Sequence, residues 1–162
     1  MQELEKYSLD DTYIRPFDRE RQEIALETED LHVFYGDNEA IHGVSLPFER
    51  YKITALIGSS GSGKSTYLRS LNRMNDNIES ARVTGKIMYR NIDINSDAVD
   101  VYEMRKHIGM VFQRPNPFAK SIYDNIAFAL RRFGIKDKKK LDEIVETSLK
   151  QAALWDQVKD DL

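Results

Sequence analysis

The sequence predicts an α/β fold, and three observations lead to this class. An apolar segment, residues 53–57, passes through a glycine-rich loop into a segment whose leucines recur at helical spacing. Strand-like stretches precede this unit, and amphipathic helical patterns follow residue 113. At 162 residues the chain is long enough for a domain with its own core. We therefore expect an antiparallel β part, a strand–loop–helix core and a helical part, in that order.

The first part of the chain predicts an arm followed by two strands. Residues 1–22 are highly charged and have no apolar periodicity, which is typical of a loose N-terminal arm. Residues 24–33 partly alternate apolar and acidic side chains, and residues 41–49 follow a turn at 36–38. These two segments are expected to be antiparallel strands.

The next element is the strand–loop–helix unit, and its loop predicts a phosphate site. The near-continuous apolar run Ile53–Ile57 suits a strand buried on both faces of a parallel sheet. Gly58 to Ser65 then fits G-x-x-x-x-G-K-[ST] at every fixed position, and Leu68 and Leu71 continue as a helix. A flexible Gly/Ser linker is the alternative, but a linker is not flanked by a buried strand and an amphipathic helix.

Each residue type in this loop has a physical role. Glycines allow backbone conformations in which successive N–H groups point inward around an anion, and the helix start adds further donors. Lys64 should reach the β and γ phosphates, and the Ser65 hydroxyl should bind Mg²⁺. The residues expected to bind the nucleotide are Gly58, Ser59, Ser60, Gly61, Ser62, Gly63, Lys64, Ser65 and Thr66.

Extended and helical segments follow the core helix. Residues 83–94 are expected to be extended, residues 99–109 a short helix closed by Gly109, and residues 110–113 ("MVFQ") a short strand. Two prolines in residues 114–120 then predict an irregular loop.

Two amphipathic helices are expected at the end of the sequence. Ser121 and Asp124 predict a capping box for the first helix, which Gly134 should end. Asp137 should cap the second helix, and Lys138–Lys140 should be its solvated first turn. The expected buried faces are Ile122, Ile126, Ala129, Leu130 and Phe133 in the first helix, and Leu141, Ile144, Val145, Leu149 and Ala152 in the second.

Composition excludes several classes of protein. The formal net charge of −3 gives no sign of a nucleic-acid surface, so we expect no nucleic-acid partner. No window approaches the roughly 18 apolar residues of a membrane span, so we expect no direct membrane insertion. The chain has no cysteine, which excludes disulfides and thiolate metal sites.

The order of motifs resembles the ATP-binding cassette (ABC) family. Phe34-Tyr35-Gly36 comes first, "GSSGSGKST" follows, and "GMVFQ" then leads into a proline-containing loop and helices. The resemblance implies that Tyr35 stacks on adenine, although a core tyrosine at a strand end is the alternative. It also implies that Gln113 approaches Mg²⁺ and the attacking water. Lys64 and Gln113 are thus the expected catalytic residues, and Ser65 and Gln113 the expected metal ligands.

Two longer stretches resemble the phosphate-importing branch of this family. They are "LNRMNDNIESARVTGKI" and "GMVFQRPNPFAKSIYDNIAFALRRFGIKD". Arg90-Asn91 is a departure, because the family usually turns there with Asp-Gly. The resemblance implies a charged arm (1–22), a P-loop ATPase core with an antiparallel β subdomain (23–113), and a Q-loop with part of a helical subdomain (114–162).

The resemblance also implies an activity, cofactors and partners. ATP and Mg²⁺ are the implied cofactors, and hydrolysis is coupled to uptake of inorganic phosphate. The implied partners are two transmembrane permease subunits that dock near residues 113–125, an extracytoplasmic phosphate-binding protein and a second ATPase copy in a homodimer. The implied location is peripheral, at the cytoplasmic face of the cell membrane.

Three family elements are absent from the sequence. There is no L-S-G-G-Q signature and no apolar strand ending in Asp-Glu, and His32, His42 and His107 all precede the Gln113 motif. We therefore expect a truncated subunit that exposes a central apolar edge and binds nucleotide without hydrolysing it. The alternatives are a non-hydrolysing nucleotide-binding adaptor, another P-loop enzyme such as a kinase or GTPase, and an importer ATPase for another cargo. No N-K-x-D guanine motif supports a GTPase.

Overall fold

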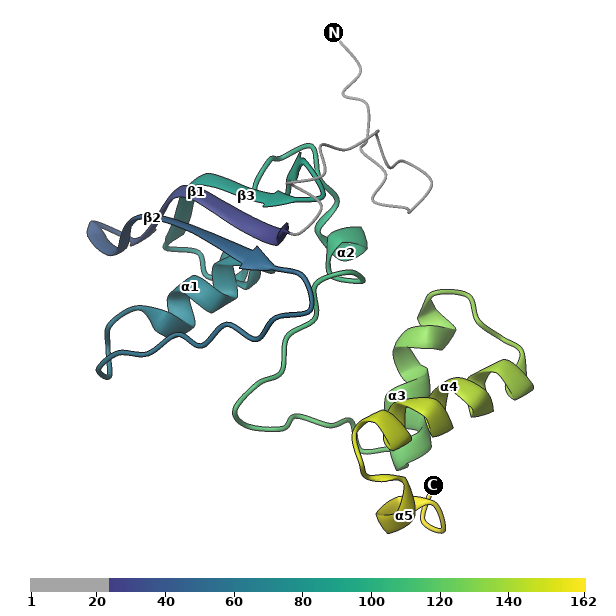
Figure 1. Ribbon diagram of the computed structural model, residues 1–162. Coiled ribbons are helices and arrows are strands. Elements are labelled where there is room, and N and C mark those ends of the chain that lie inside the picture. Colours follow the sequence, from purple (N-terminus) through teal and green to yellow (C-terminus); the bar gives the residue numbers. More distant parts are fainter. Residues whose placement is uncertain (1–23) are drawn as a thin grey trace, which may run out of the picture. The chain divides into compact units, whose positions relative to one another are not determined.

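The computed structural model describes residues 24–162, which divide into two compact units (Figure 1). The first unit ends at Val111, and the second runs from Phe112 to Leu162. The boundary predicted from the sequence lies two residues later, between residues 113 and 114. The arm predicted at residues 1–22 lies outside the described residues. Each unit is described by itself.

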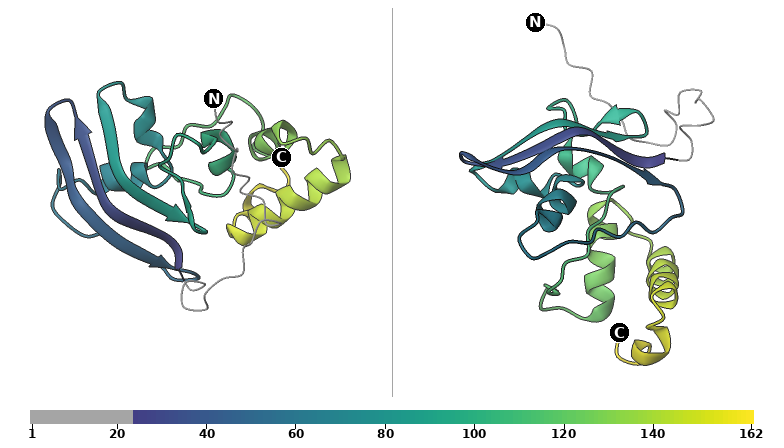
Figure 2. Two further views of the ribbon diagram at one scale, coloured as in Figure 1. Left: turned by 90° about the horizontal axis from the view of Figure 1, so that it is seen from above. Right: turned by 60° about the vertical axis from the view of Figure 1, so that its left-hand side comes forward.

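The first unit is built on an antiparallel sheet of four strands in the order β2-β1-β3-β4, with helix α1 on one face (Figures 1 and 2). The antiparallel strands predicted at residues 24–33 and 41–49 are confirmed. The strands are β1 (Ile24–Tyr35), β2 (Asn38–Glu49), β3 (Ala81–Tyr89) and β4 (Ile92–Asp93), and the helices are α1 (Lys64–Ser70), the 3-10 turn η3 (Met74–Asn77) and α2 (Val101–Met104).

The core of the first unit lies between the sheet and α1. Tyr67 of α1 stacks on Phe48 of β2, and its hydroxyl lies 2.8 Å from Thr28 Oγ1 of β1. Burial raises the pKa of Tyr67, so the hydroxyl keeps its proton and remains available for this hydrogen bond. The buried apolar residues are Leu31, Val33, Ile41, Tyr67, Leu71, Ile87, Ile94, Val99 and Met104.

A line of left-handed residues crosses the three long strands. Asp30 in β1, Gly43 in β2 and Gly85 in β3 have φ of 48°, 63° and 86°. A Cβ on Gly85 would lie 2.1 Å from the Asp30 carbonyl oxygen, and one on Gly43 would lie 2.9 Å from Asp30 Oδ1. The pairing register of β1 and β3 shifts at this point. Glycine is thus required at position 85, where a Cβ would meet the backbone of β1, whereas at position 43 a Cβ would meet side chains and the left-handed backbone favours glycine.

Two strands predicted from apolar runs are absent among the described residues. Residues 53–57 and 110–113 are irregular, and both predictions of strands are wrong for this structure. Ile53, Ile57 and Val111 expose 100%, 94% and 97% of their surface. An extended segment becomes a strand only when a neighbouring strand completes its hydrogen bonds, and no described segment pairs with either run.

The second unit is a set of helices whose ends follow the predicted caps. The helices are α3 (Ile122–Arg132), α4 (Lys138–Gln151) and α5 (Trp155–Val158). The Asp124 N–H donates to Ser121 Oγ over 3.0 Å, and the Lys139 N–H donates to Asp137 Oδ1 over 2.8 Å. Gly134 follows α3 with φ of 90°, as expected of a glycine that ends a helix.

The buried face of α3 differs in part from the predicted one. Ala127 is fully buried, and Tyr123, Ile126 and Leu130 pack around it, together with Leu141, Val145 and Leu149 of α4. Ile122 and Phe133 are instead 37% and 52% exposed, and Ala129 is also exposed. The reason is that α3 packs on α4 through its Tyr123 side, where the Tyr123 hydroxyl donates to Asp142 Oδ1 over 2.6 Å.

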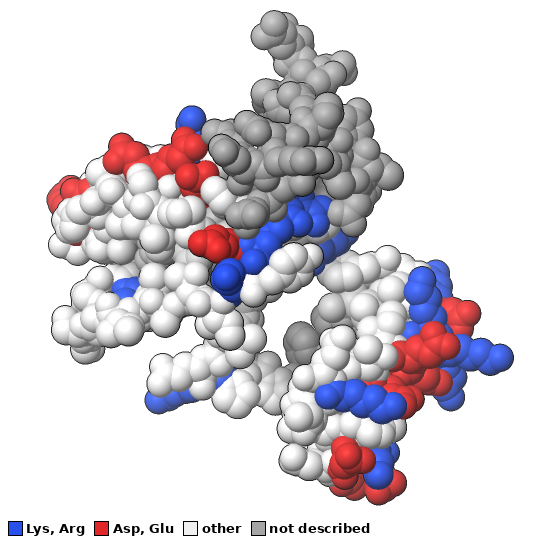
Figure 3. Space-filling model, viewed as in Figure 1, with Lys and Arg blue, Asp and Glu red and all other residues white. Residues whose placement is uncertain are grey.

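Charged side chains of both signs are interspersed on the helical unit (Figure 3). Several form pairs, including Lys150 with Glu146 at 2.5 Å and Arg131 with Asp124 at 2.6 Å. The lysines at 138–140 are exposed, as predicted for a solvated first turn. Across residues 24–162 we find no helix with the length and apolarity needed to cross a bilayer.

Candidate nucleotide site

The glycine-rich loop closes against β2 and begins α1. Gly61 and Gly63 have φ of 79° and 85°, a region that residues with a Cβ rarely adopt. A Cβ on Gly63 would lie 2.7 Å from Ile41 Cδ1 and 3.0 Å from the Ala40 carbonyl oxygen. Gly63 therefore allows both the turn of the chain into α1 and the close contact of the loop with the sheet.

The Lys64 ammonium group is held inside the loop. Its Nζ donates to the carbonyl oxygens of Gly58 and Ser59 over 2.8 and 2.6 Å, and to Ser62 Oγ over 3.1 Å. Three oxygen atoms thus satisfy its three N–H groups. Phosphate oxygens are stronger acceptors than these neutral oxygens, so an anion at the loop can replace them as partners of the lysine.

The other donors of the loop suit an anionic ligand. Ser59, Ser60, Ser62 and Ser65 are exposed, and their hydroxyls accompany the backbone N–H groups of a loop with two left-handed glycines. This set of one ammonium, several hydroxyls and backbone donors fits a phosphate chain. The Ser65 hydroxyl offers an oxygen ligand of the kind Mg²⁺ accepts. Within the described residues, no cluster of three or more His, Cys, Asp or Glu could hold a metal ion.

Tyr35 lies close to the first turn of α1. It is the last residue of β1 and is half-buried, and its hydroxyl lies 3.1 Å from Asn75 Oδ1 and 3.4 Å from Thr66 Oγ1. The structure therefore brings together Tyr35 and the loop helix, which are far apart in the sequence. Stacking of Tyr35 on a base stays a prediction.

Gln113 belongs to the second unit, whereas the loop residues belong to the first. It is exposed, and it lies in an irregular segment instead of at the end of the expected strand. Its pairing with Ser65 as a metal ligand and its catalytic role therefore stay predictions.

Comparison with known proteins identifies the family. A family model described as "ABC transporter" matches residues 41–162. The chain belongs to the ABC transporter family. This confirms the predicted fold class, a P-loop NTPase core of the ABC type with an antiparallel β part and the start of a helical part.

Curated relatives in this ABC transporter family are similar over nearly the whole chain. The chain is 73% identical to "Phosphate import ATP-binding protein PstB 2" of Enterococcus faecalis over 159 residues, which are 98% of this chain and 59% of that protein. It is 75% identical to "Phosphate import ATP-binding protein PstB 1" of Latilactobacillus sakei over 156 residues, 96% of this chain and 58% of that protein. The chain thus spans less than two thirds of the length of these ABC relatives.

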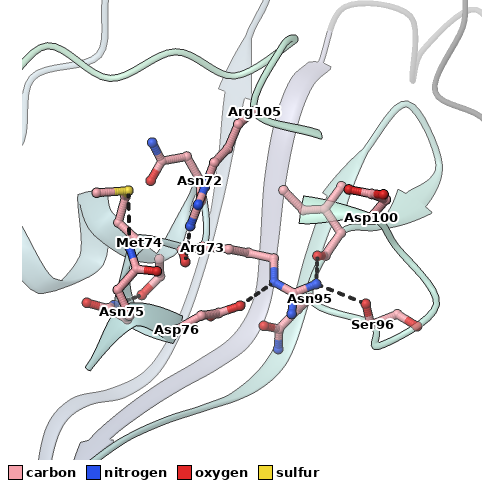
Figure 4. A network of polar contacts seen from close by, with 12 residues as sticks. Asn72, Arg73, Met74, Asn75, Asp76, Asn95, Ser96, Asp100 and Arg105 are labelled. Atoms are coloured by element: carbon pink, nitrogen blue, oxygen red, sulfur yellow. Dashed lines mark hydrogen bonds and ion pairs between the residues drawn. The ribbon is translucent and has the colours of Figure 1, made fainter. Parts of the chain in front are cut away.

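A polar network that was not predicted from the sequence lies beside the loop helix (Figure 4). Arg73, with φ of 59°, donates from Nε to Asp76 Oδ2 over 2.8 Å and from Nη1 to the Ser96 carbonyl over 3.1 Å. Arg105 donates to the carbonyl oxygens of Asn72 and Arg73 over 3.1 and 2.8 Å. The polar run "NRMND" (residues 72–76), directly after the predicted helix, could have indicated this network. In the prediction it supported only the family resemblance.

Proposed function

We propose that this chain is the nucleotide-binding part of an ABC importer ATPase that couples ATP hydrolysis to the uptake of inorganic phosphate. The observation that carries the proposal is the identity of 73–75% to proteins named as phosphate import ATP-binding proteins, over 96–98% of the chain. The cargo is proposed from those names, because the fold of an ATP-binding subunit does not by itself identify what is transported.

The loop supplies the groups that the proposed reaction requires. Lys64 exchanges its loop oxygens for the β and γ phosphates of ATP, and the Ser65 hydroxyl binds Mg²⁺. Tyr35 stacks on the adenine. Gln113 is carried over from the family resemblance as a residue that would help to hold Mg²⁺ and orient the attacking water. The remaining residues of 58–66 surround the phosphates with backbone and hydroxyl donors.

The proposed partners are those that the family resemblance implies. Two transmembrane permease subunits dock near residues 113–125, an extracytoplasmic phosphate-binding protein delivers the anion, and a second ATPase copy completes a homodimer. The subunit is then peripheral to the membrane, on its cytoplasmic face. Its proposed domains are those of the sequence analysis: residues 1–22, 23–113 and 114–162.

Uptake of radiolabelled phosphate by cells tests this function. Cells that carry Lys64→Ala in the natural-length protein should lose uptake through this system, whereas Lys139→Ala, an exposed lysine of α4, should leave uptake unchanged. Loss of uptake of a different solute, with phosphate uptake intact, would contradict the proposed cargo. Normal phosphate uptake in the Lys64→Ala variant would contradict the proposed function.

A further inference from the structure

Asn75 joins the end of β1 to the loop helix. Its side chain is fully buried in η3 and uses both ends of its amide. Nδ2 donates to the Thr66 carbonyl oxygen over 3.0 Å and to Ser70 Oγ over 2.7 Å. Oδ1 accepts from the Tyr35 hydroxyl over 3.1 Å. One side chain thus contacts β1 and both halves of α1.

The orientation of the Asn75 amide follows from its partners. A backbone carbonyl only accepts hydrogen bonds, so the NH₂ group must face Thr66. The amide oxygen then faces the Tyr35 hydroxyl, which donates. The Nδ2 side stabilises α1, and the Oδ1 side restrains the tyrosine. Removing the hydroxyl of Tyr35 leaves both Nδ2 hydrogen bonds in place. It removes the hydrogen bond to Asn75 Oδ1 together with the longer one, 3.4 Å, to Thr66 Oγ1.

The turn that carries Asn75 is itself held in place (Figure 4). Arg73 donates to Asp76 within the turn and to Ser96 beyond β4, and Arg105 donates to the carbonyl oxygen of Arg73. Asn75 therefore has little freedom to follow a movement of Tyr35. Its hydrogen bond is a fixed anchor for the tyrosine ring.

A restrained ring has a consequence for nucleotide binding. Tyr35 is half-buried and packs against the core of the first unit, and the anchored hydroxyl further limits rotation about its two side-chain bonds. The anchor sets the ring relative to Thr66 and therefore to the first turn of α1, which carries Lys64 and Ser65. A nucleotide whose base stacks on the ring and whose phosphates lie at the loop then meets two groups already at the correct separation.

We propose that Asn75 is a positioning residue for ATP, because it holds the stacking ring of Tyr35 at a fixed place relative to the phosphate loop. This inference rests on the proposed function. It concerns binding of the base, and it leaves the contacts of the phosphates unchanged.

Titration calorimetry of the natural-length protein with ATP and with inorganic tripolyphosphate tests the proposal. Tyr35→Phe keeps the ring and removes the anchor, so ATP affinity should fall about twofold to tenfold, as expected for one hydrogen bond, while tripolyphosphate affinity stays unchanged. Asn75→Leu should lower the ratio of ATP affinity to tripolyphosphate affinity by at least as much as Tyr35→Phe does. In the double variant the ratio should fall no further than in Asn75→Leu. Asn77→Ala, an exposed residue of the same turn, is the matched control and should bind both ligands normally.

The outcomes separate this inference from the proposed function. Equal ATP affinity in the wild type and Tyr35→Phe, or an equal loss for both ligands, overturns the positioning role alone. Because Tyr35→Phe leaves the buried amide in place, this result does not depend on whether Asn75→Leu folds. A wild-type protein that does not bind ATP overturns the proposed function and the positioning role together.

Discussion

Replacing Gly85 with alanine should destabilise the sheet more than the same change at Gly36. Both glycines belong to the first unit and have positive φ, 86° at Gly85 and 58° at Gly36. They differ in their surroundings. A Cβ on Gly85 would lie 2.1 Å from the carbonyl oxygen of Asp30, whereas nothing lies within 4 Å of a Cβ on Gly36.

The expected costs follow from these surroundings. At Gly36 only the left-handed backbone opposes alanine, which costs about 1–2 kcal/mol. At Gly85 the same cost is increased by overpacking of about 1–3 kcal/mol, because a backbone carbonyl of the central strand must move. The sum of about 2–5 kcal/mol is a large part of the 5–15 kcal/mol that typically stabilises a domain.

Urea unfolding of the two variants and the wild type measures these costs. Gly85→Ala should lower the free energy of unfolding by at least about 1 kcal/mol more than Gly36→Ala does. Equal stability of the two variants would contradict the prediction that a Cβ at position 85 clashes with the backbone of β1 at Asp30.

Three further predictions concern charge, the apolar edge and a helix cap. The hydrogen bond to Glu39 raises the pKa of His32 above its ordinary value of 6.5, so the stability that His32 contributes should be lost as pH rises above about 6.5. The same hydrogen bond lowers the pKa of Glu39 below its ordinary value of 4.5, so the stability that Glu39 contributes should be lost as pH falls below about 4.5. His32→Gln should flatten urea stability measured between about pH 6 and 9, and an unchanged pH slope would count against the pair. The exposed apolar segment 53–57 should make the 162-residue chain self-associate, and Ile57→Lys should lower the associated fraction measured by sedimentation. A wild-type chain that is monomeric and melts cooperatively would contradict this prediction. Ser121→Ala should destabilise α3 by about 1 kcal/mol in thermal unfolding, and an unchanged melting temperature would show that the cap contributes nothing.

Elements specified by local chemistry were predicted from the sequence. Ser121 and Asp137 have side-chain oxygens that cap backbone N–H groups, and Gly134 adopts the left-handed conformation that ends a helix. The glycines at 61 and 63 have the positive φ that a phosphate loop requires. These features depend on a few neighbouring residues, which the sequence shows directly.

Features that depend on distant partners were not predicted. The apolar run 53–57 has the composition of a strand, but the described residues provide no strand to pair with it. The buried side of α3 depends on where α4 packs, and the sequence pattern did not show that Tyr123 contacts Asp142. Asn75 lies forty positions from Tyr35, and no local pattern indicates that the two would bond.

Calorimetric titration of ATP with Mg²⁺ into the natural-length protein and its Lys64→Ala variant tests the central claim most directly. The loop places three oxygen atoms around the Lys64 ammonium, and phosphate oxygens should take their place. The wild type should therefore bind ATP, and the variant should show no measurable binding while its circular dichroism spectrum is unchanged. A Lys64→Ala variant that folds and binds ATP with wild-type affinity would contradict the assignment of this loop as the nucleotide site.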